Sequence, residues 1–205
     1  MDKSIDDILF EVPPQADYAV DAFDLSEEDI PQSRVTAVSH LLNSEDDFIR
    51  YTAARLLTSW GYEQGVEELE KFEYDNNLGF IDHRLHGYDD SSYHNLRALI
   101  SFWALNSDRG HGAYAYQRIK PIVFDIINKF NAQPFEISPL LRLIARRRFE
   151  EYIPLIKEHL ITIIDHPEGH GWKIHDAIEL LLKFDGGFVM NLLSEKGKTL
   201  KDFNF

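Results

Sequence analysis

The chain contains no cysteine among its 205 residues. A disulfide framework, a thiol nucleophile and a cysteine-ligated zinc site are therefore excluded. Long apolar runs are also missing, because the longest aliphatic stretch, residues 160–164, includes Thr162 and is far shorter than the roughly 20 residues that span a bilayer. The first residues show no basic patch followed by an apolar core, so we expect no secretory signal, and a cytoplasmic protein is the default expectation.

Basic side chains are scarce in the N-terminal part of the chain. Residues 1–33 hold ten acids and one base, residues 34–90 twelve acids and five bases, and residues 91–205 thirteen acids and fifteen bases. The net charge of −14 therefore lies essentially in the first 90 residues. A field of this sign repels nucleic acid and anionic lipid and attracts basic proteins. The alternative is that the acidic charge serves only to keep the protein soluble.

The composition, with 44% apolar and 27% charged residues, is that of a globular protein and excludes disorder of the whole chain. Its length suits one domain or one short repeat array. No segment alternates with period 2, whereas apolar residues recur at helical spacing between prolines and glycines. Helices are expected at about 4–10, 33–42, 45–60, 63–74, 92–106, 113–131, 138–147, 152–165, 171–185 and 187–195, with an irregular or weakly helical arm at 11–29.

Several residues predict where these helices begin and end. Ser44 and Ser138 are expected N-caps, the second followed by a proline at the first helical position. Gly61 is expected to end the helix that starts after Ser44, and Pro167 to close the helix before it. Pro121 predicts a kink or a late start in the helix that contains it.

The sequence also repeats itself. A shift of 124 residues, without a gap, superposes apolar positions of the 48–69 segment on those of 172–193: Phe48 on Trp172, Ala53 on Ala177, Leu56 on Leu180, Leu57 on Leu181, Trp60 on Phe184, Val66 on Met190 and Leu69 on Leu193. A third copy starts at Leu140 and a looser fourth at Ala98, so the spacings are 45, 42 and 37 residues. A two-helix unit of about 40 residues is the period of HEAT-type repeats.

The clearest copy resembles a HEAT-like (armadillo-type) repeat of the short bacterial kind, and the residues that carry this resemblance are Asp47, Arg50, Ala53, Ala54, Leu57, Gly61, Gly65 and Leu69. The resemblance implies an all-α fold, a short right-handed α-α superhelix (HEAT-like solenoid) of about four helix pairs plus N-terminal helices. It covers about three quarters of the chain by repeat spacing. We expect one domain, 1–205, with an acidic arm and helix at 1–33, repeats over 34–205 and an insertion loop at 74–93. The HEAT-like resemblance implies a binding role and no particular chemistry.

Two features predict a partner-binding surface. The residues Glu63, Glu67, Glu70 and Tyr74 follow a 4-3-4 spacing opposite the apolar side of their helix, and the resemblance implies that this face lines the concave surface. The loop at 74–93 is long and rich in aromatic, histidine and acidic residues. The predicted contact residues are Glu63, Glu67, Glu70, Tyr74, Asp75, Asp82, His86, Tyr88, Asp89, Asp90 and Tyr93. The alternatives are an ordinary solvated helix face and a connector that covers the flank.

The nine histidines do not form a recognised metal motif. His83 and His86 are three residues apart, but no thiol or glutamate completes a recognised metal-ligand spacing. The second cluster lies near a helix start, where prolines and glycines are expected to break the regular helix that would align its members: His166, His170 and His175 beside Pro167, Gly169 and Gly171. The Gly-His-Gly turns at 110–112 and 169–171 lack the lysine and hydroxyl residue of a nucleotide loop. We therefore expect no metal, no cofactor and no enzymatic activity.

The leading hypothesis is an acidic immunity (inhibitor) protein that binds a basic, nuclease-like bacterial toxin and covers its active site. Neutralising proteins of bacterial toxin systems include HEAT-like examples, so the resemblance permits this role. The expected protein is a monomer on its own and binds neither nucleic acid nor a membrane directly. One alternative is an adaptor or assembly scaffold with apolar contacts. Another is a lyase-type HEAT-like enzyme with a cleft lined by His83, His86 or Tyr88.

Overall fold

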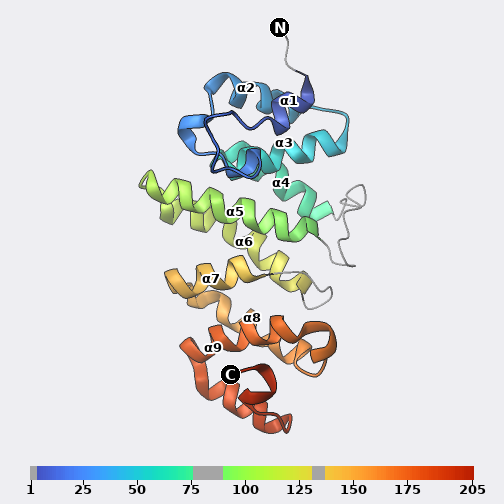
Figure 1. The fold of residues 1–205 in the computed structure, drawn as a ribbon, viewed down its shortest axis with the longest axis vertical. Helices are drawn as coiled ribbons and strands as arrows, with labels where there is room; N and C mark the ends of the chain where they lie inside the picture. Colours follow the sequence, from blue (N-terminus) through green and yellow to red (C-terminus); the bar gives the residue numbers. More distant parts are fainter. Residues whose placement is uncertain (1–3, 76–89, 131–136) are drawn as a thin grey trace. The chain divides into compact units, whose positions relative to one another are not determined.

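The computed structural model describes residues 4–75, 90–130 and 137–205, and this part of the chain is helical and contains no β-strand (Figure 1). The expectation of an all-α protein is confirmed for these residues. None of the helices described there combines the length and hydropathy that crossing a membrane requires.

The described residues fall into two compact units. Residues 4–75 and 94–122 form the first, and residues 90–93, 123–130 and 137–205 form the second. The units are described separately below, and the prediction that they make one domain stays a prediction.

The first unit begins with short elements and continues with longer helices. These are α1 (Ile5–Phe10), two 3-10 turns η1 (Ala22–Asp24) and η2 (Glu27–Asp29), α2 (Gln32–Leu41), α3 (Asp47–Ser59), α4 (Glu63–Asp75), most of α5 (Asp90–Asp108) and the first half of α6 (Gly112–Phe130). Nearly every residue of α3 from Tyr51 onward is buried, so α3 is the central helix of this unit. Gly61 follows α3 with a φ of +83°, the left-handed conformation that favours glycine and ends the helix as predicted.

The acidic arm between α1 and α2 packs onto this centre. The Trp60 indole donates a hydrogen bond of 2.9 Å to the Ala22 carbonyl, and Ala16, Ala22 and Leu25 are buried with α3 in one apolar cluster. Arg34 on α2 donates to the carbonyls of Ile8 (2.9 Å) and Glu11 (2.7 Å). The arm is therefore irregular, as expected, and is also part of the core.

Helices α3 and α4 approach closely because Gly65 lies between them. A Cβ atom at Gly65 would lie 2.4 Å from the Thr58 nitrogen and 2.7 Å from the Ala54 oxygen. Arg50 joins the two helices electrostatically, since its side chain pairs with Asp47 and, over 3.2 Å, with Glu68 on α4. Asp47, Arg50 and Gly65, three of the residues on which the HEAT-like resemblance rests, thus all act in the packing of one helix pair.

A chain of buried hydrogen bonds links α5 to this pair. The Tyr51 hydroxyl on α3 donates to Asn95 Oδ1 over 2.6 Å, and Asn95 Nδ2 donates to Glu73 Oε1 on α4 over 2.5 Å. Asn106 at the other end of α5 donates to the Gly61 carbonyl over 3.1 Å. Because buried polar groups need partners, these bonds fix how α5 lies along α3.

The second unit contains α7 (Ser138–Arg147), the 3-10 turn η4 (Glu150–Tyr152), α8 (Ile153–Ile163), α9 (Pro167–Glu195) and η5 (Leu200–Phe203). Helix α9 is two helical segments that meet at Asp185, whose φ of −151° and ψ of 72° are not helical. Asp185 Oδ1 accepts from the Phe188 backbone N–H over 3.0 Å and so caps the second segment. The break lies where Asp185-Gly186-Gly187 predicts it.

Some predicted helix ends are wrong in detail. Asp46 caps α3 in place of Ser44, because its carboxylate accepts from the backbone N–H groups of Phe48 (2.9 Å) and Ile49 (3.2 Å). Ile137, and not Ser138, is the N-cap residue of α7, and the Ser138 hydroxyl donates instead to Asp176 over 2.8 Å. Helix α6 runs through Pro121 from Gly112 onward, without the late start that the proline predicts as one outcome.

The start of α9 also differs from the expectation. Pro167 is the first residue of α9 rather than the end of α8, and Gly169 and Gly171 lie within the first turns of the helix. Proline is favoured at the first helical position, where its missing N–H has no partner to lose. The helix therefore starts about four residues earlier than the glycines indicate.

Burial follows the 124-residue repeat through the first helix of each copy. Ala53 and Ala177 are both fully buried, as are Leu57 and Leu181. After the turn the correspondence is partial: Leu69 and Leu193 are both buried, whereas Val66 is buried and its counterpart Met190 is 53% exposed. The internal similarity therefore describes a real likeness of packing in α3 and the first part of α9, and a looser one in the helices that follow.

Candidate protein-binding surface

The acidic face predicted on α4 lies next to α6, and one arginine joins the two helices. Arg118 pairs with Glu63 over 2.5 Å and with Glu70 over 2.7 Å. Its side chain is 18% exposed, and its pKa is raised because the hydrogen bonds to Glu70 and Glu63 outweigh the opposing effect of burial. The acidic face predicted to bind a partner is therefore not exposed along its whole length. Glu63 and Glu70 are half-buried in an ion-pair network, and Glu67 alone of these three glutamates is exposed.

Tyr114 lies one helical turn before Arg118 on the same side of α6. Its side chain is 58% exposed, and its hydrogen bond to Glu63 raises the pKa of the phenol, with burial and the charge of Glu63 adding to the effect. Tyrosine is among the residue types that are enriched at protein-binding surfaces.

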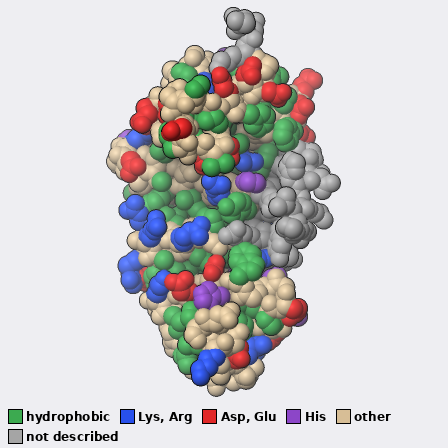
Figure 2. Space-filling view, viewed as in Figure 1, with side chains coloured by type: hydrophobic (Ala, Val, Ile, Leu, Met, Phe, Trp, Pro, Cys, Tyr) green, Lys and Arg blue, Asp and Glu red, His purple; other side chains and the backbone are tan. Residues whose placement is uncertain are grey.

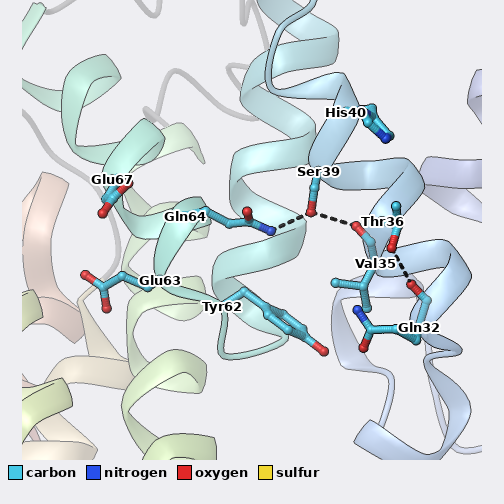
Figure 3. Close-up of a pocket in the computed structure, with 9 residues that line it drawn as sticks. All are labelled: Gln32, Val35, Thr36, Ser39, His40, Tyr62, Glu63, Gln64 and Glu67. Atoms are coloured by element: carbon cyan, nitrogen blue, oxygen red, sulfur yellow. Dashed lines mark hydrogen bonds between the residues drawn. The ribbon is translucent and has the colours of Figure 1, made fainter.

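An open groove adjoins this face on the side of α2. Its volume is about 590 Å³, and its walls come from one side of α2 and from the start of α4 (Figure 3). The residues that line it are Gln32, Val35, Thr36, Ser39, His40, Tyr62, Glu63, Gln64 and Glu67. Glu63 and Glu67 thus belong both to the predicted acidic face and to the groove.

One side-chain hydrogen bond joins the two walls of the groove, and a second lies within α2. Gln64 Nε2 on α4 donates to the Ser39 hydroxyl over 2.5 Å, and that hydroxyl donates to the Val35 carbonyl over 2.8 Å, as Figure 3 shows. The Gln64 side chain therefore spans from α4 to α2. The groove is part of the fold and does not need a ligand to form.

Other acidic side chains surround this surface. Residues 4–75 and 94–122 carry nineteen acidic and eight basic side chains, a net charge of −11. Figure 2 shows acidic side chains gathered over the part of this unit where α1 and α2 lie. Among the described residues, Asp17, Glu28, Glu45 and Glu67 are exposed and have no ion pair with a basic side chain. The unit therefore keeps a strong negative field after its internal ion pairs are counted.

The remaining predicted contact residues are only partly described. Tyr74 and Asp75 form the last turn of α4 and Asp90 is the first residue of α5, while Tyr93 is half-buried on α5 in the second unit. Asp82, His86, Tyr88 and Asp89, and with them most of the predicted insertion loop and the His83 cleft, lie outside the described residues.

The sequence prediction missed the side chains that α6 and α2 bring to this surface. Arg118 is 48 residues from Glu70 along the chain, so spacing within one helix could not reveal the pairing. A signal was present in α6 itself, where Tyr114 and Arg118 share one face.

No group of three or more side chains able to ligate a metal comes together in the part of the chain that the structure describes. His170 lies within the first part of α9, and its pKa is lowered by burial and by the charges of Lys173 and His166.

The chain matches no family of known proteins, and neither a curated protein nor a solved structure is similar to it at a significant level.

Proposed function

We propose that this protein is a HEAT-like binding module that neutralises a basic protein, most specifically a nuclease-like bacterial toxin, by covering its cationic active site. The observation that carries the proposal is the net charge of −11 on residues 4–75 and 94–122, next to a preformed groove and the exposed Tyr114. A negative field of this size steers a cationic partner and speeds its association.

The packing of the first unit supports the HEAT-like part of the proposal. Helix α5 lies along α3 through Asn95 and Asn106, and α6 lies along α4 through Arg118. Contacts of α5 with α3 and of α6 with α4 are those that stacked helix pairs of a solenoid would make, and they support the proposal, although Asn95 of α5 also bonds to Glu73 on α4. In such a solenoid the acidic face and Tyr114 would belong to the layer of second helices.

The test is a reconstitution with the product of the gene adjacent to the one that encodes this chain. We expect that product to be basic and toxic, to form a stable complex with this protein, and to lose its DNA or RNA cleavage activity in the complex. Affinity should fall as salt rises, because the proposed attraction is electrostatic. A neighbouring product that is not toxic, or that cleaves equally well with this protein in excess, would contradict the inhibitor role.

Charge reversal separates an inhibitor from a scaffold with apolar contacts. Glu67→Lys combined with Glu28→Lys should weaken an electrostatically steered complex on the order of tenfold or more, whereas a scaffold would lose little. Glu70 is unsuitable for this test, because its reversal would also break the internal ion pair with Arg118.

A further inference from the structure

A small cavity of the first unit lies between the acidic arm, α3 and α5. Its volume is about 20 Å³, which suits a group of the size of a water molecule or a small ion. Its walls are η1 with the residue before it, Arg55 and Ser59 of α3, and one side of α5 from His94 to Ser101. Ser59 is buried whereas Arg97 is exposed, so the cavity extends from the surface toward the core.

Arg55 contributes a charged side chain to this cavity and pairs with no described acid. Its guanidinium carbon lies 4.4 Å from the centre of the Phe23 ring and 5.6 Å from that of the Tyr51 ring, so two aromatic rings hold the side chain in place. Within the described part of the chain the guanidinium makes neither a hydrogen bond nor an ion pair, and its Nε is buried. A buried donor without an acceptor is unfavourable, so an acceptor inside the cavity would be bound with a gain in free energy.

The other polar groups of the cavity include two serine hydroxyls, and its two aspartates are already engaged. Ser59 is 6% exposed and Ser101 is half-buried, and neither hydroxyl is hydrogen-bonded to a described residue. Asp24 pairs with Arg97 over 3.1 Å, and the Asp21 carboxylate caps η1 by accepting a backbone N–H over 2.8 Å. The guanidinium and the two hydroxyls therefore remain as donors to a group inside the cavity.

We propose that this cavity binds one chloride ion, held by the guanidinium of Arg55 and the hydroxyls of Ser59 and Ser101. A halide ion suits the volume of the cavity and accepts hydrogen bonds from several directions, whereas a water molecule would leave the charge of Arg55 uncompensated. The net charge of −11 on this unit opposes an anion, so we expect weak binding. The site shares no residue with the candidate protein-binding surface, and the inference does not rest on the proposed function.

The first test follows the ³⁵Cl magnetic resonance signal of sodium chloride, which broadens when chloride exchanges with a protein site. We expect the full chain to broaden this signal and Arg55→Met to lose most of the excess line width, because methionine keeps the apolar contact with Phe23 without the charge. Ser59→Ala should lose part of it. Arg142→Met is the matched control and should keep the excess, since Arg142 is exposed on α7 and forms no ion pair with a described acid. Equal excess line widths for Arg55→Met and the unaltered chain would overturn the proposal.

The second test measures stability, and it remains valid if Arg55→Met is itself less stable. Urea denaturation is compared in sodium gluconate and in sodium chloride of the same ionic strength. Chloride at about ten times its dissociation constant should raise the ratio of folded to unfolded chain about tenfold. Arg142→Met should show the same rise and Arg55→Met should show none, because each variant is compared with itself in the two salts. An equal rise in all three proteins, or no rise in the unaltered chain, would refute the chloride site.

Discussion

Arg118 changes how the acidic face of α4 is interpreted. Two of the three glutamates that form a stripe on α4 are bound by this arginine, so their carboxylates stabilise the α4–α6 contact and are less available to a partner. Removing the arginine leaves two half-buried carboxylates close together without a cation, which is costly in a partly desolvated site.

We therefore expect Arg118→Gln to lower the free energy of unfolding by about 1–3 kcal/mol. Urea denaturation followed by circular dichroism measures this loss. Arg142→Gln is the matched control, because Arg142 is exposed on α7 and no ion pair with a described acid involves it. Adding Glu63→Gln and Glu70→Gln to Arg118→Gln should recover most of the stability, and equal stability of the two single variants would contradict the ion-pair network.

His159 is a second residue whose surroundings set a measurable property. It is 2% exposed on α8, and its pKa is lowered to about 4 by burial first and then by the charges of Lys173 and His170. The unfolded chain takes up the proton near pH 6.5, before the folded chain does, so stability conferred by the neutral imidazole is present above pH 6.5 and is lost as the pH falls from 6.5 toward 4.

The total loss from this group should be on the order of 3 kcal/mol. His159→Gln removes the titration, so its free energy of unfolding should fall less steeply between pH 6.5 and 4 than that of the unaltered chain. His40→Gln, at an exposed position on α2, should leave the slope unchanged. Parallel pH curves for His159→Gln and the unaltered chain would show that the buried imidazole does not control acid stability.

At the level of helices, apolar periodicity predicted which segments form helices, whereas the residues that cap the helix ends were less predictable. The break at Asp185 and the end at Gly61 follow from residues with strong local preferences, and the structure confirms both. Ser44 and Ser138 failed as caps because a hydroxyl can be replaced by a better acceptor nearby, Asp46, or drawn to a partner far along the chain, Asp176. A local rule could not include that second competitor.

Alanine substitution at two helical glycines is expected to have opposite effects on the free energy of unfolding. Gly65→Ala places a Cβ against the backbone of α3, where neither helix can move independently, so we expect a loss of about 3 kcal/mol or more. Gly171→Ala, in α9 with no atom within 4 Å of the added carbon, should increase stability by about 0.5–1 kcal/mol because alanine favours helix. Urea midpoints of the two variants test both. Similar effects at the two positions would show that the close approach of α3 and α4 does not constrain residue 65.

At the scale of the whole molecule, the sequence predicted the all-α class and the unequal distribution of charge, and it could not predict the groove. The charge count is a property of the chain itself. The groove depends on Ser39, Tyr62 and Gln64 meeting across two helices, and none of these residues carries a pattern that marks a site. The candidate surface was therefore only partly predictable from the sequence. The acidic side chains on α4 were predicted, whereas the wall formed by α2 and the aromatic side chain of Tyr114 on α6 were not.

The unequal charge leads to a prediction about association that net charge alone does not make. Lysine substitutions at Asp17, Glu28 and Glu67 change the net charge by six in the first unit, and the same substitutions at Glu158, Glu168 and Glu195 change it by six in the second. All six side chains are exposed, so both triple variants should remain folded. If the basic partner docks on the first unit, its association rate at about 50 mM salt should fall on the order of tenfold or more for the first set of substitutions and only slightly for the second set. The difference between the two sets should become smaller at about 300 mM salt, because screening shortens the range of the electrostatic field. Stopped-flow mixing with the partner measures both rates. An equal decrease for the two sets would mean that total charge governs the encounter, and the acidic first unit would then have no special part in docking.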